Sequence, residues 1–98
     1  MAEKFERGYM LKIQRSGNGE VVFILSGRMN EENIAEVQEL FRSETEDRRI
    51  VLDLKDLALV DRDAVKFLER CEADSIKLIN CPAYIREWIE KERGQRKR

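Results

Sequence analysis

The residues most suited to form a site are the charged triplet Asp61-Arg62-Asp63, which lies between an apolar segment and a helical pattern. The apolar segment, this triplet and the beginning of the helical pattern together occupy the segment from Arg49 to Leu68. In α/β folds, ligands and partners usually bind where the chain leaves a strand and a helix begins. The sequence therefore predicts that a site lies at this strand-to-helix exit.

The residue types present in the sequence exclude several kinds of catalytic site. There is no histidine, so Ser-His-Asp and Cys-His nucleophiles cannot be built. Cys71 and Cys81 form no Cys-x-x-Cys pair, and we expect two reduced thiols that pack as small apolar residues. No glycine-rich phosphate loop occurs. An acid pair could still be drawn from the 20 Asp and Glu residues, but none is singled out. We therefore expect no enzyme activity, no metal and no cofactor.

Composition and charge point to a small cytoplasmic domain. The 98 residues carry a net charge of −1, which gives no general attraction to nucleic acid. The longest apolar runs have four or five residues, whereas a membrane-spanning helix needs about 20, so no membrane insertion is expected. The N-terminal MAEKFERGYM lacks the apolar core of a signal peptide. We expect one domain over residues 1–98, with a core at about 9–91 and a basic tail at 94–98.

Turn and periodicity signals predict the secondary structure. An Asn-Gly turn within residues 16–19 predicts a hairpin of two antiparallel strands. Consecutive apolar residues predict that the second strand and the central strand are buried on both faces. Asn30 and Asp61 are expected to cap helices, and Lys55-Asp56 to form a turn after the central strand. In the helix after Asp61, the inward apolar stripe is expected to consist of Ala64, Phe67, Leu68 and Cys71. The expected strands are 9–13, 20–25, 49–54 and 75–80, with a short connection at 26–29, and the expected helices are 31–43, 62–73 and 83–93, the last of them ended by Gly94.

The order β-β-α-β-α-β-α predicts an α/β fold. Each of the two later strands follows a helical crossover, so it joins the hairpin as a parallel neighbour. The result is a single four-stranded mixed sheet with the helices packed mainly on one face.

This order, with three particular stretches, resembles the STAS domain, the module of anti-sigma-factor antagonists and of sulfate-transporter C-terminal regions. The stretches are VVFILSGRMN at 21–30, RRIVLDLKDLALVDRDAVKFL at 48–68 and SIKLINCPAYIREWI at 75–89. They are similar to the second strand of that family with its closing glycine, to its central strand and switch loop, and to its last core strand with the C-terminal helix. The resemblance covers the chain from about Tyr9 to Lys91.

In the members switched by phosphorylation, the loop reads Asp, Ser or Thr, Ser, Gly, and the second hydroxyl accepts phosphate. The corresponding residues here are Asp61, Arg62, Asp63 and Ala64, so this loop has no phosphoacceptor. Two interpretations of Asp63 stay open. Its carboxylate imitates a phosphate in part, with a charge of −1 against about −1.5 to −2, or it is an ordinary acid in the first turn of a helix.

The resemblance implies a non-catalytic protein–protein interaction module in bacterial regulation. The residues expected to face a partner are Asp61, Arg62, Asp63, Ala64, Arg28 and Asn30. The implied partner is an anti-sigma-type kinase. The alternative is a small-ligand-binding protein or an accessory subunit of a transporter or lipid-transport complex. A homodimer is left open, with the Tyr84 and Trp88 pair either in the core or on a dimer face.

Overall fold

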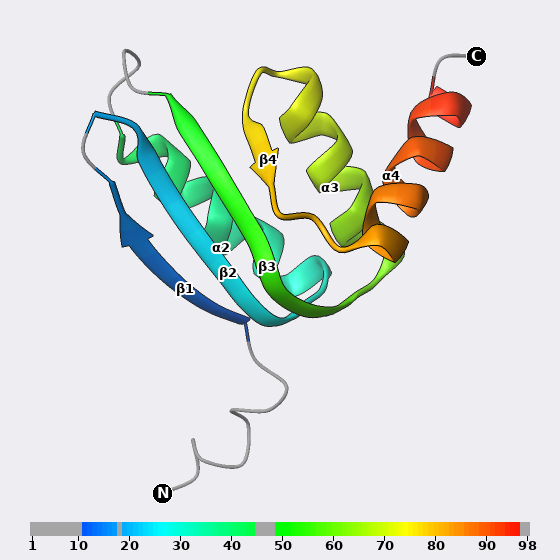
Figure 1. Cartoon of the computed structure of the whole chain (residues 1–98), viewed down its shortest axis with the longest axis horizontal. Coiled ribbons are helices and arrows are strands. Elements are labelled where there is room, and N and C mark those ends of the chain that lie inside the picture. The colour runs from blue at the N-terminus through cyan, green and yellow to red at the C-terminus, as the bar shows by residue number, and fades with distance from the viewer. Residues whose placement is uncertain (1–10, 18, 45–48, 97–98) are drawn as a thin grey trace, which may run out of the picture.

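The computed structural model describes residues 11–17, 19–44 and 49–96, and it confirms the predicted α/β fold and element order. Four strands form one mixed sheet, with three helices beside it (Figure 1). The elements are β1 (Leu11–Ser16), β2 (Val21–Met29), α2 (Glu31–Arg42), β3 (Ile50–Val60), α3 (Arg62–Ala73), β4 (Lys77–Ile79) and α4 (Ala83–Arg96).

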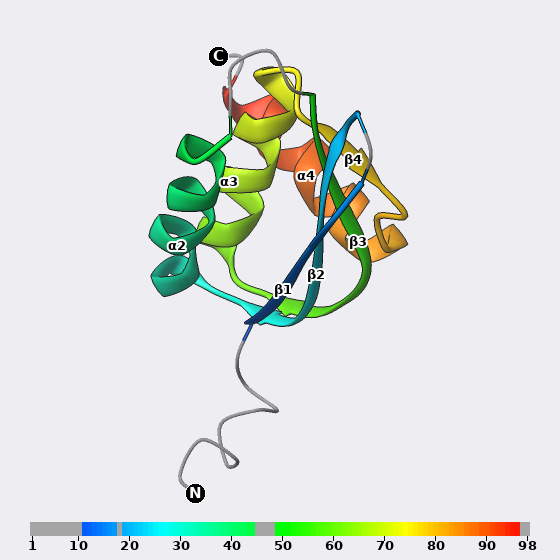
Figure 2. The same cartoon turned by 90° about the vertical axis from the view of Figure 1, so that its left-hand side faces the viewer.

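The strands lie in the order β1-β2-β3-β4. The hairpin partners β1 and β2 are antiparallel, whereas β2 with β3 and β3 with β4 are parallel. Helices α2 and α3 cover one face of the sheet, and α4 packs beside α3 (Figures 1 and 2). Because β2 and β3 are parallel neighbours, the helices that follow them begin at the same end of the sheet.

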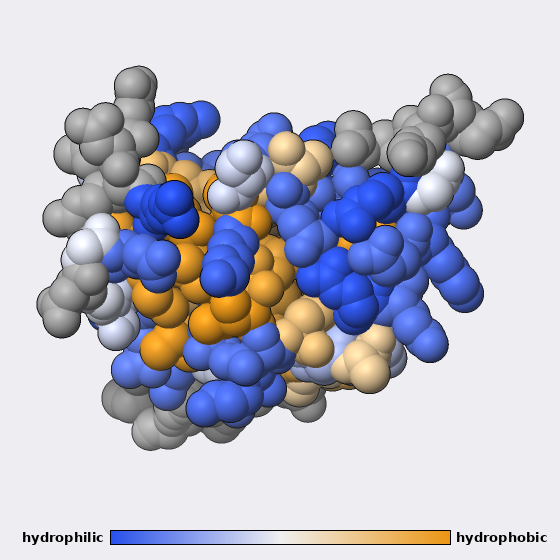
Figure 3. Space-filling model, turned by 45° about the horizontal axis from the view of Figure 1, so that its top comes forward, coloured by the Kyte–Doolittle hydropathy of each residue, from blue (hydrophilic) through white to orange (hydrophobic). Residues whose placement is uncertain are grey.

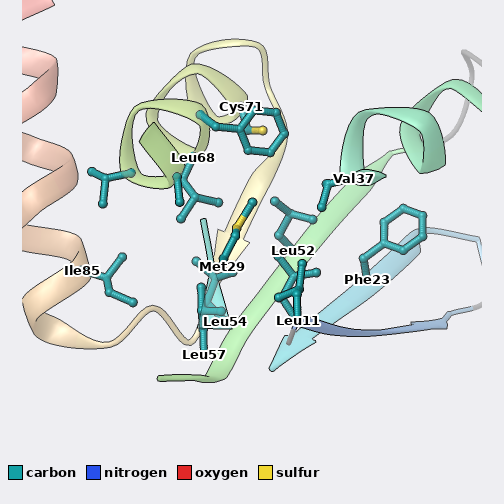
Figure 4. Packing of buried hydrophobic residues seen from close by; sticks show 14 of the residues in the cluster. Leu11, Phe23, Met29, Val37, Leu52, Leu54, Leu57, Leu68, Cys71 and Ile85 are labelled. Carbon is teal, nitrogen blue, oxygen red and sulfur yellow. The ribbon is translucent and has the colours of Figure 1, made fainter. Parts of the chain in front are cut away.

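The core lies between the sheet and the helices. Val37 of α2, Leu68 of α3 and Ile85 of α4 point toward Leu52 and Leu54 of β3 (Figure 4). The apolar stripe predicted for the helix after Asp61 is buried in this core. That stripe consists of Ala64, Phe67, Leu68 and Cys71.

The prediction that the inner strands are buried on both faces is wrong for β2. Val21, Phe23 and Leu25 point into the core, but Val22 and Ile24 are only half-buried. The reason is that the described helices all pack against the same face of the sheet. Apolar side chains therefore remain visible among charged ones on the surface of the protein (Figure 3).

Both long strands continue through residues that were expected to leave the sheet. The connection at 26–29 is the last part of β2, and Lys55-Asp56 lies inside β3 rather than in a turn. The pairing passes from Ile24 opposite Asp53 to Ser26 opposite Asp56, so β3 contains an extra residue at this point. Such a β-bulge lets turn-forming residues remain within a paired strand. A second irregularity follows Gly27, whose φ is 95°.

Other element boundaries differ by smaller amounts. The first strand was expected at 9–13, but residues 9 and 10 lie outside the described ranges, and β1 runs over Leu11–Ser16. Strand β4 is shortened to three residues, and Ser75 and Asn80, on either side of it, have positive φ values of 76° and 54°. Helix α4 continues past Gly94 to Arg96, so Gly94 does not end it. Residues 97 and 98 of the predicted basic tail lie outside the described ranges.

Ion pairs reinforce the contact between α3 and α4. Arg86 of α4 donates from both terminal nitrogens to the two carboxylate oxygens of Glu72, at 2.9 and 3.0 Å. Arg93 donates to the same carboxylate. The hydrogen bond from Arg86 is the main reason that the pKa of Glu72 is lowered, although partial burial acts in the opposite direction. The planar guanidinium suits this paired geometry better than a lysine would.

The aromatic pair at the start of α4 has two different environments. Trp88 packs against the core, whereas Tyr84 is largely exposed and its hydroxyl donates to the carbonyl oxygen of Ala58 in β3. No helix within the described ranges has both the length and the apolar character needed to cross a bilayer.

Gly94 provides a test of the extended α4. A Cβ at this position would meet no atom within 4 Å, and the backbone is helical. Gly94→Ala should therefore raise the free energy of unfolding, by about 0.5–1 kcal/mol for a helix interior, in urea denaturation. Gly17→Ala is the matched control, because its φ is 118° and its Cβ would lie 2.2 Å from the carbonyl oxygen of Glu20. Gly17→Ala should destabilise the protein. A Gly94→Ala variant that is also less stable would contradict a helix at this position.

Candidate functional site

Asp61 links the starts of two helices through one carboxylate. Its Oδ1 accepts from the backbone N–H of Ala64 at 2.9 Å, which makes Asp61 the N-cap of α3 as predicted. Its Oδ2 accepts from the backbone N–H of Glu31, the first residue of α2, at 3.3 Å. The backbone N–H of Asp61 also donates to the carbonyl oxygen of Met29 at 3.3 Å. The ends of β2 and β3 and the starts of α2 and α3 are therefore held at one place.

Asn30 caps α2, as the sequence predicted. Its Oδ1 accepts from the backbone N–H of Glu32 at 2.9 Å, while the side chain of Asn33 accepts from the backbone N–H of Asn30, also at 2.9 Å. This reciprocal arrangement satisfies two helix N–H groups that would otherwise lack partners. The side chain of Asn30 is thus committed to the helix start, so its role at the site is to position α2.

Two exposed carboxyl groups meet above these helix starts. Glu31 of α2 hydrogen bonds with Asp63 of α3, and this bond is the largest cause of a raised pKa of Glu31. Repulsion from the Asp63 charge adds to it, with smaller contributions from Asp61 and Glu32. The end of the fold where α2 and α3 begin therefore presents an acidic surface made of Glu31, Glu32, Asp61 and Asp63.

Arg62 is attached to the third helix. Its Nε donates to Oε2 of Glu92 in α4 at 3.2 Å, and the Arg62 side chain is 61% exposed whereas that of Glu92 is 9% exposed. Most of the Arg62 side chain is therefore exposed to solvent, but the ion pair with Glu92 anchors it to α4. Arg28 lies opposite Leu59 in the β2–β3 register and is half-buried. Ala64 is fully buried, so it supports the start of α3 from the core side.

The structure thus brings most of the predicted residues together and adds two more. Glu31 and Glu32 were predicted in the first turn of a helix but not as part of the site. A signal was present, because Asn30 and Asp61 each follow one of two strands that were expected to be parallel neighbours. Parallel strands end at the same edge of a sheet, so the acids that follow the two caps are expected to lie close together.

Burial affects the protonation of both cysteine thiols. Burial raises the pKa of the Cys71 thiol to about 12, which keeps it protonated and unreactive. Burial also raises the pKa of Cys81. No group of His, Cys, Asp and Glu within the described ranges is arranged to hold a metal ion. Neither models of known protein families nor the sequences of curated proteins match this chain.

Asp61 should contribute most to stability among the acids of this surface. Asp61→Ala removes acceptors for two backbone N–H groups, so we expect a loss of about 1–2 kcal/mol in the free energy of unfolding. Asp61→Asn keeps one acceptor oxygen and should lose less. Asp63→Ala removes no cap and should change stability by less than about 0.5 kcal/mol. Urea denaturation of the three variants checks this order, and an Asp61→Ala variant no less stable than Asp63→Ala would contradict the bridging role.

The carboxyl pair makes a second prediction, which concerns protonation. Asp63→Asn should lower the pKa of Glu31 toward its ordinary value, because the hydrogen bond to the Asp63 carboxyl and the charge of that carboxyl both disappear. The pKa of Glu31 is higher in the folded protein than its ordinary value in the unfolded chain. The free energy of unfolding therefore decreases as the pH rises from the ordinary pKa to the raised one. Asp63→Asn should remove that cost. Carbon NMR titration of the Glu31 carboxyl measures the change, and Glu32→Gln is the control, with a much smaller effect. An unaltered Glu31 pKa in Asp63→Asn would disprove the pairing.

Proposed function

We propose that the chain is a non-catalytic, STAS-like protein–protein interaction module in bacterial regulation, acting in the cytoplasm, and that its partner docks on the acidic surface where α2 and α3 begin. The observation that carries the proposal is the Asp61 carboxylate, which joins both helix starts. A surface fixed in this way binds a partner without first being ordered, which reduces the entropy cost of association.

The charge of this surface indicates the kind of partner. Helix N-termini ordinarily attract anions, because their N–H groups are unpaired and the helix dipole is positive there. At this site the N–H groups of Glu31 and Ala64 already bond to Asp61, and exposed acids surround them. The surface therefore favours a partner with Arg or Lys side chains. Arg62, anchored by Glu92, adds one cation at its border.

The pairing of Glu31 with Asp63 bears on the missing phosphoacceptor. A phosphoserine has a charge of about −1.5 to −2 and three acceptor oxygens. A single aspartate supplies only part of that, whereas the two adjacent carboxylates supply four oxygens and a charge of −2 once Glu31 has lost the proton of its hydrogen bond with Asp63. This supports the interpretation that the loop is a permanent substitute for a phosphorylated one. The module would then be controlled by the amounts of its partners instead of by a kinase reaction.

Copurification with charge reversal tests the proposal. Tagged wild-type protein from its native host should recover an ATPase of the histidine-kinase type, and Asp63→Lys should weaken that complex tenfold or more, which is about 1.4 kcal/mol. The matched control is Glu87→Lys, an exposed acid on α4 with the same change in charge. Asp63→Ser should restore phosphorylation by the partner. Equal binding of the partner by wild type and Asp63→Lys would refute the site.

An accessory role in a transporter or lipid-transport complex is the second candidate, and the uncovered face of the sheet favours it. Half-buried Val22, Ile24 and Ile79 lie on β2 and β4, and Leu59 near the end of β3 is 56% exposed. A larger complex would cover such a surface. Recovery of a transporter ATPase or a permease in the same experiment would favour this function, with hydrogen-exchange protection on the strands in place of the helix starts.

A further inference from the structure

A hollow lined by charged and amide side chains lies between α3 and α4. It has a volume of about 300 Å³, near the lower end of the 300–1,000 Å³ typical of small-molecule sites. The described residues that line it are Arg62, Lys66, Glu69, Arg70, Glu92 and Gln95. All are charged or carry an amide. Of these residues, only Arg62 also borders the acidic surface proposed as the partner site.

The two carboxylates of the hollow already have cationic partners. Glu92, 9% exposed, accepts from Nε of Arg62 at 3.2 Å. Glu69, 2% exposed, lies 3.6 Å from Nε of Arg93. Buried carboxylates need such partners, because burial of an unpaired charge costs several kcal/mol. The arrangement is therefore a built one, in which buried acids fix two arginines at the junction of the helices.

Cations remain in excess after these pairs are counted. Lys66 and Arg70 also line the hollow, and neither forms an ion pair with a carboxylate in the described part of the chain. Arg62 uses only Nε in its contact with Glu92, so its two terminal nitrogens remain as donors. Residues 62, 66 and 70 follow one another at intervals of four on α3, with a rise of about 6 Å per interval. Like charges at this spacing weaken a helix by about 0.2–0.5 kcal/mol per pair.

We propose that this hollow binds a small phosphorylated polyol, with the phosphate held by Lys66 and Arg70. Guanidinium and ammonium groups are the usual donors to phosphate oxygens. The free carboxylate oxygen of Glu92, whose other oxygen accepts from Arg62, and the amide of Gln95 supply acceptors for hydroxyl groups. No aromatic residue is among the described lining residues, so the described part of the hollow offers no stacking surface for a nucleobase.

Titration with glucose 6-phosphate, followed by amide NMR, tests this site in the full chain. The phosphorylated sugar should shift signals in residues 62–70 and 92–95 and should saturate at millimolar concentration or below. Inorganic phosphate should bind at least tenfold more weakly, because it lacks the hydroxyl contacts. Glucose alone should cause no saturable shift, because it lacks the phosphate.

The double variant Lys66→Gln/Arg70→Gln should weaken glucose 6-phosphate binding tenfold or more while its NMR spectrum shows an unaltered fold. A matched control, Lys77→Gln/Lys91→Gln, removes the same charge from exposed positions outside the hollow and should bind as the wild type does. Equal weakening in both double variants would mean a general charge effect and would overturn the site. Equal affinity for phosphate and for glucose 6-phosphate would overturn the polyol assignment. Asp63→Lys should leave this binding intact, so the partner proposal is tested separately.

Discussion

At the end of the sheet where α2 and α3 begin, the fold depends on one carboxylate that accepts hydrogen bonds from both helices. Each helix start has N–H groups without partners inside the helix, and an acid at the cap ordinarily satisfies those of its own helix. Asp61 accepts from Ala64 in α3 and from Glu31 in α2, so the same side chain caps α3 and fixes the start of α2. This sharing is available only because β2 and β3 are adjacent and parallel, with Met29 opposite Val60.

The same arrangement accounts for the acidic character of the surface. First-turn acids are favourable in either helix alone, since each interacts with the positive end of its own helix dipole. When the two starts are brought together, the hydrogen bond with Asp63 and the charge of that residue raise the pKa of Glu31. First-turn acids that stabilise each helix separately thus form a repulsive contact when the two helices pack in the folded protein. The proposed binding of a cationic partner would relieve this repulsion, which connects the stability of the site to the function proposed for it.

Local chemistry made several features predictable from the sequence. Asn30 and Asp61 were identified as caps because Asn and Asp side chains reach the N–H groups of a following turn wherever they precede a helix. The stripe on α3 followed from helical spacing. Long-range pairing was not predictable in the same way. Lys55-Asp56 has the residues of a turn, but pairing with β2 holds it inside β3 through a bulge. The meeting of Glu31 with Asp63, and the hollow between α3 and α4, depend on strand register and helix packing.

Amide hydrogen exchange in wild type and Asp61→Ala measures the shared cap most directly. The account predicts that the substitution removes protection from the N–H groups of both Glu31 and Ala64, although these lie in different helices. The N–H of Asn33, which donates to the carbonyl oxygen of Asn30 at 2.9 Å, is the internal control and should stay protected. Loss of protection at Ala64 alone, with Glu31 exchanging as in the wild type, would contradict the claim that Asp61 holds the two helix starts together.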